Sequence, residues 1–225
     1  MMKNLIMVFA ILFSGTLLSQ EEITQQLESF SEVKVYNGLK LNLHYADENK
    51  AVVKGEKRGD VQFEVEDGIL KVKMNIDNIW KEDNTIVDLY FKFLKNIDAR
   101  QNSSVELPEL YKTEVLNLEA SEGAEIYAEI EVQDLSVKSL TGGEVEVKGK
   151  AETQDVKIRA GGQYYARYLD SRNISISISA GGVADINASE KVDAKVRAGG
   201  TVNVYGNPEI IDKDTLFGGK VNRKN

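Results

Sequence analysis

The chain contains no cysteine, and this absence excludes several classes of chemistry. Disulfide bonds, thiol catalysis and a lipid-modified N-terminal cysteine all need a residue that the 225-residue sequence lacks. An exported protein of this composition has to gain its stability from packing and backbone pairing instead.

Histidine is almost absent as well, because His44 is the only one. A Ser-His-Asp triad would have to use it, but it stands next to Leu43 at an outward-phased position, which favours a surface histidine over a catalytic one. Carboxylates near 47–48 and over 77–83 are typical of solvated turns rather than of a hard-cation site. The sequence therefore predicts no catalytic residue, no metal site and no cofactor.

Basic residues are outnumbered, with 28 Lys and Arg against 36 Asp and Glu and a formal net charge of −8. Phosphate neutralisation needs a clustered excess of cations, so we expect no nucleic-acid partner.

Long apolar runs are confined to the N-terminus, where Lys3 precedes an apolar stretch from Leu5 to Phe13 and small residues follow. This pattern is typical of a secretory signal peptide over residues 1–19, too short for a membrane span. We expect a flexible leader over 20–29, a single domain over 30–225, and no transmembrane segment after signal removal. The segment therefore predicts an exported protein.

Strict alternation of apolar and polar residues begins at Phe30. Val33 and Val35 lead into Asn37-Gly38, a strong hairpin signal, and further alternating segments follow at 51–53, 61–65, 70–74 and 85–93. The sequence predicts an N-terminal β-meander. Trp80, in the charged loop over 77–84, is expected to pack over a core edge.

Small-residue pairs recur through the rest of the chain, with first members 21, 19, 19, 20, 18 and 19 residues apart. Apolar residues recur at fixed offsets from the pairs, with polar residues between them. They stand three and five places after most pairs, and seven and five places before the pairs at 123, 142, 181 and 199. The pairs are Asn102-Ser103, Gly123-Ala124, Gly142-Gly143, Gly161-Gly162, Gly181-Gly182, Gly199-Gly200 and Gly218-Gly219.

One such repeat cannot fold alone. It buries about four apolar side chains at roughly 1.5–3 kcal/mol each, whereas ordering its backbone costs about 1–2 kcal/mol per residue. Stacking lets every strand pair with its equivalents in the neighbouring coils. We therefore predict an all-β fold, a parallel β-solenoid of about seven short coils.

The glycines are predicted to form the corners of these coils, because glycine adopts left-handed backbone angles and permits close approach. Phosphate-binding loops would need a following Lys-Ser/Thr or a helix start, and none of the pairs has one.

The outward columns supply the candidate binding face. Positions four and six after the pairs interleave aromatic, acidic and cationic residues, and the candidates are Tyr127, Tyr165, Arg167 and Tyr205. Rigid tyrosines suit glycan stacking or protein contact. Cross-coil ladders that only stabilise the sheet explain the same residues, and of the two interpretations we favour this one. The opposite outward columns gather cations at Lys157, Arg159, Lys195 and Arg197, which are typical of a solvated face.

Taken together, the export signal, the opening Phe30-x-x-Val33-x-Val35-x-x-Gly38-x-x-Leu41, the Ser/Ala-Gly-Gly-x-Val-x-Val units and the close at Gly206-Asn207-Pro208 resemble the head-GIN domain family, the putative auto-transporter adhesins. The resemblance covers about 30–221. It implies a right-handed parallel β-helix that is exported to the periplasm or the outer cell surface of a Gram-negative bacterium. It implies no assigned enzyme activity, and it supplies no binding residues. The chain departs from the pattern at Gln163 to Tyr168, where heavier side chains replace light β-branched ones.

Three functions follow as hypotheses. The first is a non-enzymatic adhesin that binds an envelope or host glycan or protein. The second is a polysaccharide-processing β-helix enzyme, and the third is a purely structural envelope protein.

Overall fold

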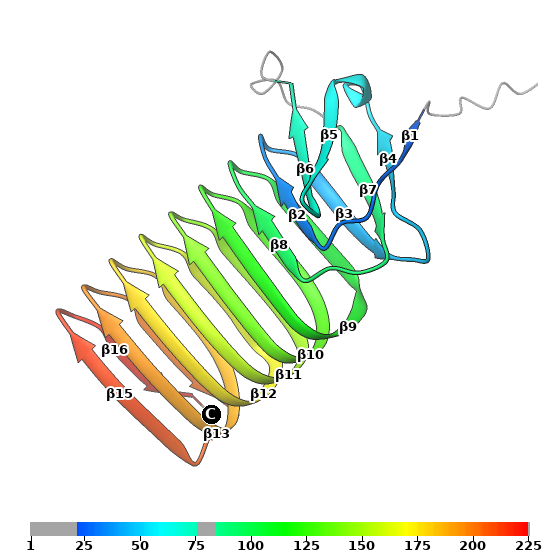
Figure 1. Cartoon of the computed structure of the whole chain (residues 1–225). Coiled ribbons are helices and arrows are strands. Elements are labelled where there is room, and N and C mark those ends of the chain that lie inside the picture. The colour runs from blue at the N-terminus through cyan, green and yellow to red at the C-terminus, as the bar shows by residue number, and fades with distance from the viewer. Residues whose placement is uncertain (1–21, 76–83, 225) are drawn as a thin grey trace, which may run out of the picture.

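The computed structural model describes residues 22–75 and 84–224, and the described chain is nearly all β. Strands stack as successive coils in a single row, with the N-terminal strands at one end and the last coil at the other (Figure 1). The predicted all-β solenoid of about seven coils is confirmed.

Sixteen strands belong to one sheet system, and the five central strands are long enough to run round most of a coil. The strands are β1 (Ile23–Gln26), β2 (Glu32–Val35), β3 (Lys40–Tyr45), β4 (Lys50–Lys54), β5 (Val61–Glu66), β6 (Ile69–Met74), β7 (Ile86–Phe91), β8 (Asn96–Ala99), β9 (Ser104–Ser121), β10 (Glu125–Leu140), β11 (Glu144–Arg159), β12 (Gln163–Ser179), β13 (Val183–Arg197), β14 (Thr201–Tyr205), β15 (Ile210–Leu216) and β16 (Lys220–Arg223). Within the described residues the single helical element, η1 (Arg58–Asp60), is one 3-10 turn.

Neighbouring coils pair in parallel and in the register that the repeat spacing predicts. The buried position three after each small pair forms one continuous column, in which Ile126 pairs with Val105 and Val145, and Tyr164 with Val145 and Ala184. Side chains of this column point into the core and their sequence neighbours point out, because successive residues of a strand face opposite sides.

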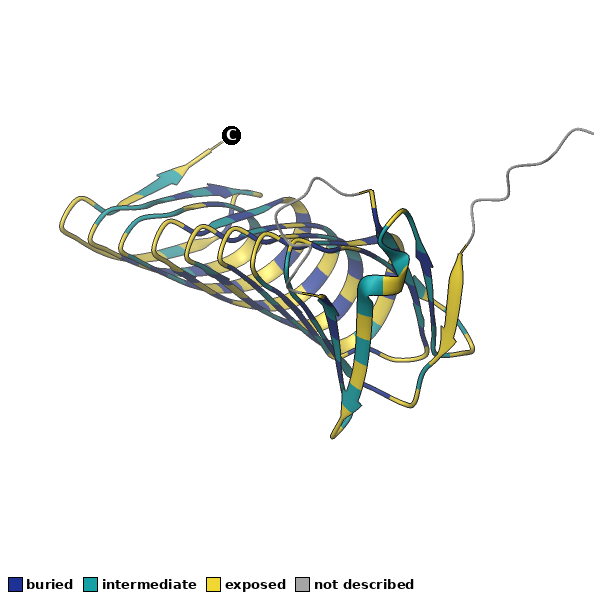
Figure 2. Ribbon diagram, turned by 90° about the horizontal axis from the view of Figure 1, so that it is seen from above, coloured by how far each residue is buried: buried dark blue, intermediate teal, exposed yellow. Residues whose placement is uncertain are grey.

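Each long strand bends where the alternation slips. In β10 the buried Val132 is followed by two exposed residues, Gln133 and Asp134, before burial resumes at Leu135. The strand thereby changes direction while its apolar side chains stay inside. Buried and exposed residues alternate along the strands of the row of coils, and many of the turns between strands are exposed (Figure 2).

The corners are tight turns, and the two glycines of a pair are needed there for different reasons. At one corner, Gly143 N donates to Leu140 O at 2.9 Å, and the two central residues, Thr141 and Gly142, both have positive φ. A Cβ on Gly143 would lie 2.2 Å from the carbonyl oxygen of Ala120 in the preceding coil. Gly142 thus provides the backbone angle and Gly143 the close approach between coils.

The N-terminal part differs from the predicted meander. β2 and β3 do not form a hairpin with each other: β2 pairs in parallel with β6 and β8, and β3 pairs in parallel with β7 and β9. Asn37 and Gly38 both have positive φ, as the two central residues of the later corners do. The turn therefore opens a coil instead of closing a hairpin. Among the described strands before β9, only β5 and β6 are consecutive strands that pair.

The fold also begins earlier than the predicted leader allows. Ile23–Gln26 forms β1, which pairs antiparallel with β4, although its side chains are exposed. This strand is held by backbone hydrogen bonds and not by buried apolar side chains. Its sequence therefore shows no apolar alternation from which a strand could be predicted. The predicted signal peptide and Trp80 lie outside the described residues. The described part of the chain holds no helix with the length and apolarity that a membrane crossing needs.

Candidate functional site

The predicted candidate residues fall on one outward face of β10 to β14, in two groups. Tyr127 and Tyr165 belong to one column and flank Glu146, which pairs with Tyr127 on one side and with Tyr165 on the other. Asp185 follows Tyr165 in the same column. Tyrosine and carboxylate therefore alternate from coil to coil, and the two tyrosine rings are separated by a strand.

The second group is a cluster of Arg167, Tyr205 and Tyr168. The Arg167 guanidinium carbon lies 4.6 Å from the centre of the Tyr205 ring and 5.9 Å from that of Tyr168. Tyr205 pairs with Asn187 of β13, so Arg167 reaches from β12 across a whole strand. Tyr168 is 73% exposed. The cluster offers a cation, an aromatic surface and two hydroxyls to solvent.

A bulge in β12 makes this cluster possible. Ala166 pairs with Ile186, whereas the next paired residue, Ser171, lies opposite Ala188, so β12 carries extra residues between them. Bulges redirect side chains and interrupt pairing. The bulge coincides with the segment in which the sequence departs from the family pattern, but sequence reasoning did not include Tyr168 among the site residues.

The electrostatics of the face follow from its alternating residues. Burial raises the pKa of the Tyr165 hydroxyl, and the carboxylates of Glu144, Asp185 and Glu146 raise it further. Tyr165 donates a hydrogen bond to Gln163 Oε1 at 2.6 Å. It therefore stays protonated at neutral pH.

At the other tyrosine, Lys148 lies 5.5 Å from the centre of the Tyr127 ring and forms a 2.9 Å ion pair with Glu129. Hydrogen bonding to Tyr127 and then to Glu129 raises the pKa of the Lys148 ammonium group. The ammonium group consequently remains charged over the tyrosine ring.

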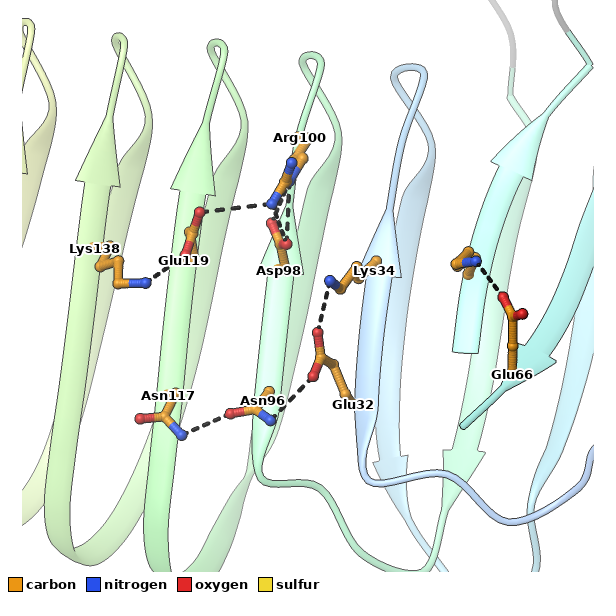
Figure 3. A network of polar contacts seen from close by, with 10 residues as sticks. Glu32, Lys34, Glu66, Asn96, Asp98, Arg100, Asn117, Glu119 and Lys138 are labelled. Atoms are coloured by element: carbon orange, nitrogen blue, oxygen red, sulfur yellow. Dashed lines mark hydrogen bonds and ion pairs between the residues drawn. The ribbon is translucent and has the colours of Figure 1, made fainter. Parts of the chain in front are cut away.

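The opposite face carries a polar network at its N-terminal end (Figure 3). Arg100 Nη2 lies 2.7 Å from the nearly buried Asp98 carboxylate and 3.7 Å from Glu119, which pairs with Lys138 at 3.0 Å. A second chain of contacts joins Glu32, Asn96 and Asn117. The predicted cation column continues from this network along the coils.

Most of these cations are compensated. Lys157 pairs with Asp155, Lys195 with Asp193, and Arg197 with Asp214. Each of these three cations therefore has an acidic neighbour. The pairing is compatible with the solvated face that the sequence predicts.

The only histidine belongs to a compact polar cluster on the first coil. His44 Nε2 lies 3.3 Å from Asp88 Oδ1, and Lys54 and Asn42 each contact the same carboxylate at 2.9 Å. The His44 ring stacks on Tyr90 with centroids 5.0 Å apart. Three side chains from β3 and β4 hold the Asp88 carboxylate of β7, so the arrangement anchors these three strands to one another.

No group of three or more His, Cys, Asp or Glu residues within 22–75 and 84–224 has the geometry to hold a metal ion. Of the two acidic stretches considered in the sequence, the first has Glu48 paired with Lys50, and the second, 77–83, lies outside the described residues.

A groove of about 920 Å³ adjoins the Arg167 cluster on the same side of the solenoid. It crosses β9 to β13, and its lining comes from 112–114, 131–133, 150–152 and 170–172, together with 187, 189 and 206. Sequence reasoning missed the groove, because it depends on where the long strands bend.

Comparison with known proteins identifies the family of the chain. The model of the family described as putative auto-transporter adhesin, head GIN domain, matches residues 29–208. No sequence among the curated proteins matches the chain.

Solved structures match over nearly their full length. The crystal structure of a putative adhesin from Bacteroides fragilis has a TM-score of 0.82 and 19% identity, covering 92% of this chain and 98% of its own. A putative adhesin from Parabacteroides distasonis has a TM-score of 0.74 and 20% identity, with coverage of 91% and 96%. A putative lipid binding protein from the same species has a TM-score of 0.70 and 17% identity, again with 91% and 96%. These likenesses show a shared fold.

Proposed function

The chain belongs to the family of putative auto-transporter adhesins with a head GIN domain, and from this membership we propose that it is a non-enzymatic exported binding protein. Its ligand is a glycan or a protein of the cell envelope or of a host. Its location is the periplasm or the outer surface of a Gram-negative bacterium. The family and the neighbours from Bacteroides fragilis and Parabacteroides distasonis with TM-scores of 0.82 and 0.74 are named as putative adhesins, and none of these names denotes an enzyme.

The observation that carries the proposal is the exposed cluster of Arg167, Tyr168 and Tyr205. Aromatic and arginine side chains dominate the energetics of recognition surfaces, because they supply large contact areas at low cost in conformational entropy. A cross-coil ladder that served stability alone would not need a bulge that leaves Tyr168 73% exposed.

The rigidity of the scaffold supports the same proposal. Strands β10 to β13 are paired on both sides, so the outward side chains are held at fixed spacing before any ligand arrives. A preorganised surface loses little entropy on binding. Tyr127 and Tyr165 extend this surface along the coils away from the cluster.

The printed name of one neighbour, a putative lipid binding protein, raises the question of a lipid ligand for this chain. The candidate face consists of tyrosine, arginine and carboxylate side chains, which suit polar ligands better than acyl chains. A glycan or a protein is therefore the preferred ligand class.

The test is a glycan array and a pull-down with the purified protein, combined with an attachment assay on cells. We expect a ligand, and we expect R167A and Y205A to weaken attachment while K157A on the opposite face leaves it unchanged. The proposal would be contradicted if no ligand is found and if substitution of Tyr165, Arg167 and Tyr205 has no effect on attachment. Release of reducing or unsaturated ends from candidate polymers would identify an enzyme instead.

Location is tested separately by fractionation of the producing cells. Recovery in the periplasm or on the cell surface is expected, and recovery in the cytoplasm would remove the export part of the proposal.

A further inference from the structure

The groove beside the Arg167 cluster runs along the solenoid axis and not along the strands. Its lining repeats from coil to coil, since 112–114, 131–133 and 150–152 occupy equivalent positions in β9, β10 and β11. A spacing of about 4.8 Å between paired strands makes the distance from β9 to β13 roughly 19 Å. A ligand that fills the groove is therefore long and extended.

The charges that line the groove are nearly balanced, with cations at Lys112, Lys150 and Arg172 and carboxylates at Glu114, Glu131, Glu152 and Asp170. On one side, Lys112 pairs with Glu131 of the next coil at 2.6 Å. On the other side, Arg172 lies 3.2 Å from Glu152 and 3.8 Å from Glu190. A charged polymer would have to compete with these ion pairs for their charged groups. A neutral ligand can instead donate hydrogen bonds to the carboxylate oxygens and accept them from the ammonium and guanidinium groups without breaking the pairs.

The central strands that line the groove are not edge strands. β10, β11 and β12 each have a parallel partner on both sides. An extended peptide gains most of its affinity by adding a strand to an open sheet edge, and these strands offer no such edge. The ligand has to be recognised by side chains alone.

The groove leads to the aromatic cluster. Asn187 and Gly206 line it, Asn187 pairs with Tyr205, and Tyr205 immediately precedes Gly206. The exposed Tyr168 stands on the β12 bulge beside Asp170, another lining residue. Aromatic rings therefore lie at one end of a polar groove, and sugar rings can pack on their faces.

We propose that this groove binds a linear, uncharged polysaccharide that lies along the solenoid axis, with a sugar ring of the chain on the Tyr168 and Tyr205 cluster. The inference rests on the proposed binding function and specifies its ligand and its site. Side-chain amides, carboxylates and hydroxyls of successive coils hydrogen-bond to successive sugars. The polar lining is unsuited to an acyl chain.

The experiment measures the affinity of the purified protein for linear neutral oligosaccharides of two to eight sugars, by calorimetry. The probes are fragments of β-glucan, xylan, mannan and chitin, and polygalacturonate serves as the charged comparison. We expect at least one neutral series to bind, with affinity that rises with chain length and levels off once the groove is spanned.

Two tryptophan substitutions locate the site. Gln133 is exposed and lies within the groove, so Q133W fills it and is expected to weaken binding at least tenfold. Ser175 is exposed on the opposite outward column, and S175W serves as the matched control, with unchanged affinity. Circular dichroism establishes that both variants are folded.

The outcomes separate the groove from the broader function. If a neutral oligosaccharide binds equally well at every length, or if Q133W leaves its affinity unchanged while R167A abolishes it, the groove is not the site, although the binding function stands. If only polygalacturonate or lipid vesicles of phosphatidylethanolamine bind, the ligand class is wrong. If no oligosaccharide binds but a protein partner is captured through the Tyr165, Arg167 and Tyr205 face, the groove inference fails and the proposed function survives.

Discussion

Arg167 and Tyr205 stack with the guanidinium carbon 4.6 Å from the ring centre, although β13 lies between the strands that carry them. The contact exists because the β12 bulge displaces Arg167 from regular pairing and lets its side chain cross the neighbouring coil. It couples three successive coils on the face that we assign to binding.

This contact predicts a measurable coupling. R167A and Y205A in a double-mutant cycle are expected to show an interaction of about 0.5–1 kcal/mol, the range of exposed cation–π pairs. Urea unfolding measures it, and the same cycle with R159A in place of R167A is the control, since no contact joins Arg159 to Tyr205. Purely additive single effects of R167A and Y205A would contradict the stacking.

Substitution of the two glycines of one corner is expected to lower the free energy of unfolding by different amounts. G142A places a methyl group in open space but at positive φ, and should cost about 1 kcal/mol. G143A places it 2.2 Å from a backbone oxygen of the preceding coil, so the coils have to separate and the cost should be clearly larger. Thermal unfolding of the two variants decides the order. Equal destabilisation would show that close approach between coils does not limit this corner.

The buried hydroxyl of Tyr164 predicts a penalty for its removal. It donates to Gln154 Oε1 at 2.7 Å, and Gln154 Nε2 donates to Ser171 Oγ at 2.5 Å, all inside the solenoid. Y164F leaves the Gln154 carbonyl oxygen without its partner, which should destabilise the fold by about 1–3 kcal/mol.

The neighbouring residue supplies the control for this prediction. Y165F removes a partly exposed hydroxyl that donates to Gln163, and water can replace it, so a smaller change is expected. A Y164F variant as stable as the parent would show that the core network contributes nothing.

The carboxylate of Asp88 predicts part of the acid sensitivity. Burial works to raise its pKa, but hydrogen bonds from Lys54, Asn42 and His44 outweigh burial, and the net pKa lies below its ordinary value. A lowered pKa in the folded state means that the stabilisation is present at neutral pH and is lost as the pH falls below about 4 toward the folded-state pKa. D88N should therefore be less stable at pH 7 and show a flatter decline between about pH 5 and 2.

Urea unfolding across this pH range measures the prediction. Asp47 is exposed and has no charged partner among the described residues, so D47N is the matched control and should keep the parent's pH profile. A D88N profile that parallels the parent's would mean that other carboxylates account for the acid sensitivity.

The repeat could be predicted from sequence because its cause is local and periodic. The column through Val105, Ile126, Val145 and Tyr164 is visible as a fixed offset from each small pair, and parallel stacking is the arrangement that buries all of it. The candidate face followed from the same offsets, since the residues between buried positions must point outward. Whether that face binds a ligand is not determined by periodicity and stays a proposal.

The N-terminal strands could not be assigned in the same way. Asn37-Gly38 has the sequence of a hairpin turn and the backbone angles of a coil corner, and those local preferences are the same in both settings. The outcome is decided by the pairing partners that the fold provides, which are β6 and β8 beside β2, and β7 and β9 beside β3. With these partners in place, β2 and β3 do not pair with each other after the turn. For β1 the pairing with β4 is made by backbone groups, which carry no side-chain signature.

The amino-acid sequence by itself determined the coil length, the inward and outward columns and the need for glycine at the corners, because each depends on spacing along the chain. The tertiary structure alone decided the contact of Arg167 with Tyr205, the course of the groove and the partners of the first strands. These features depend on the bulge in β12, on the bends of the long strands and on which strands lie side by side, and such relations between distant segments are not contained in the period of a repeat.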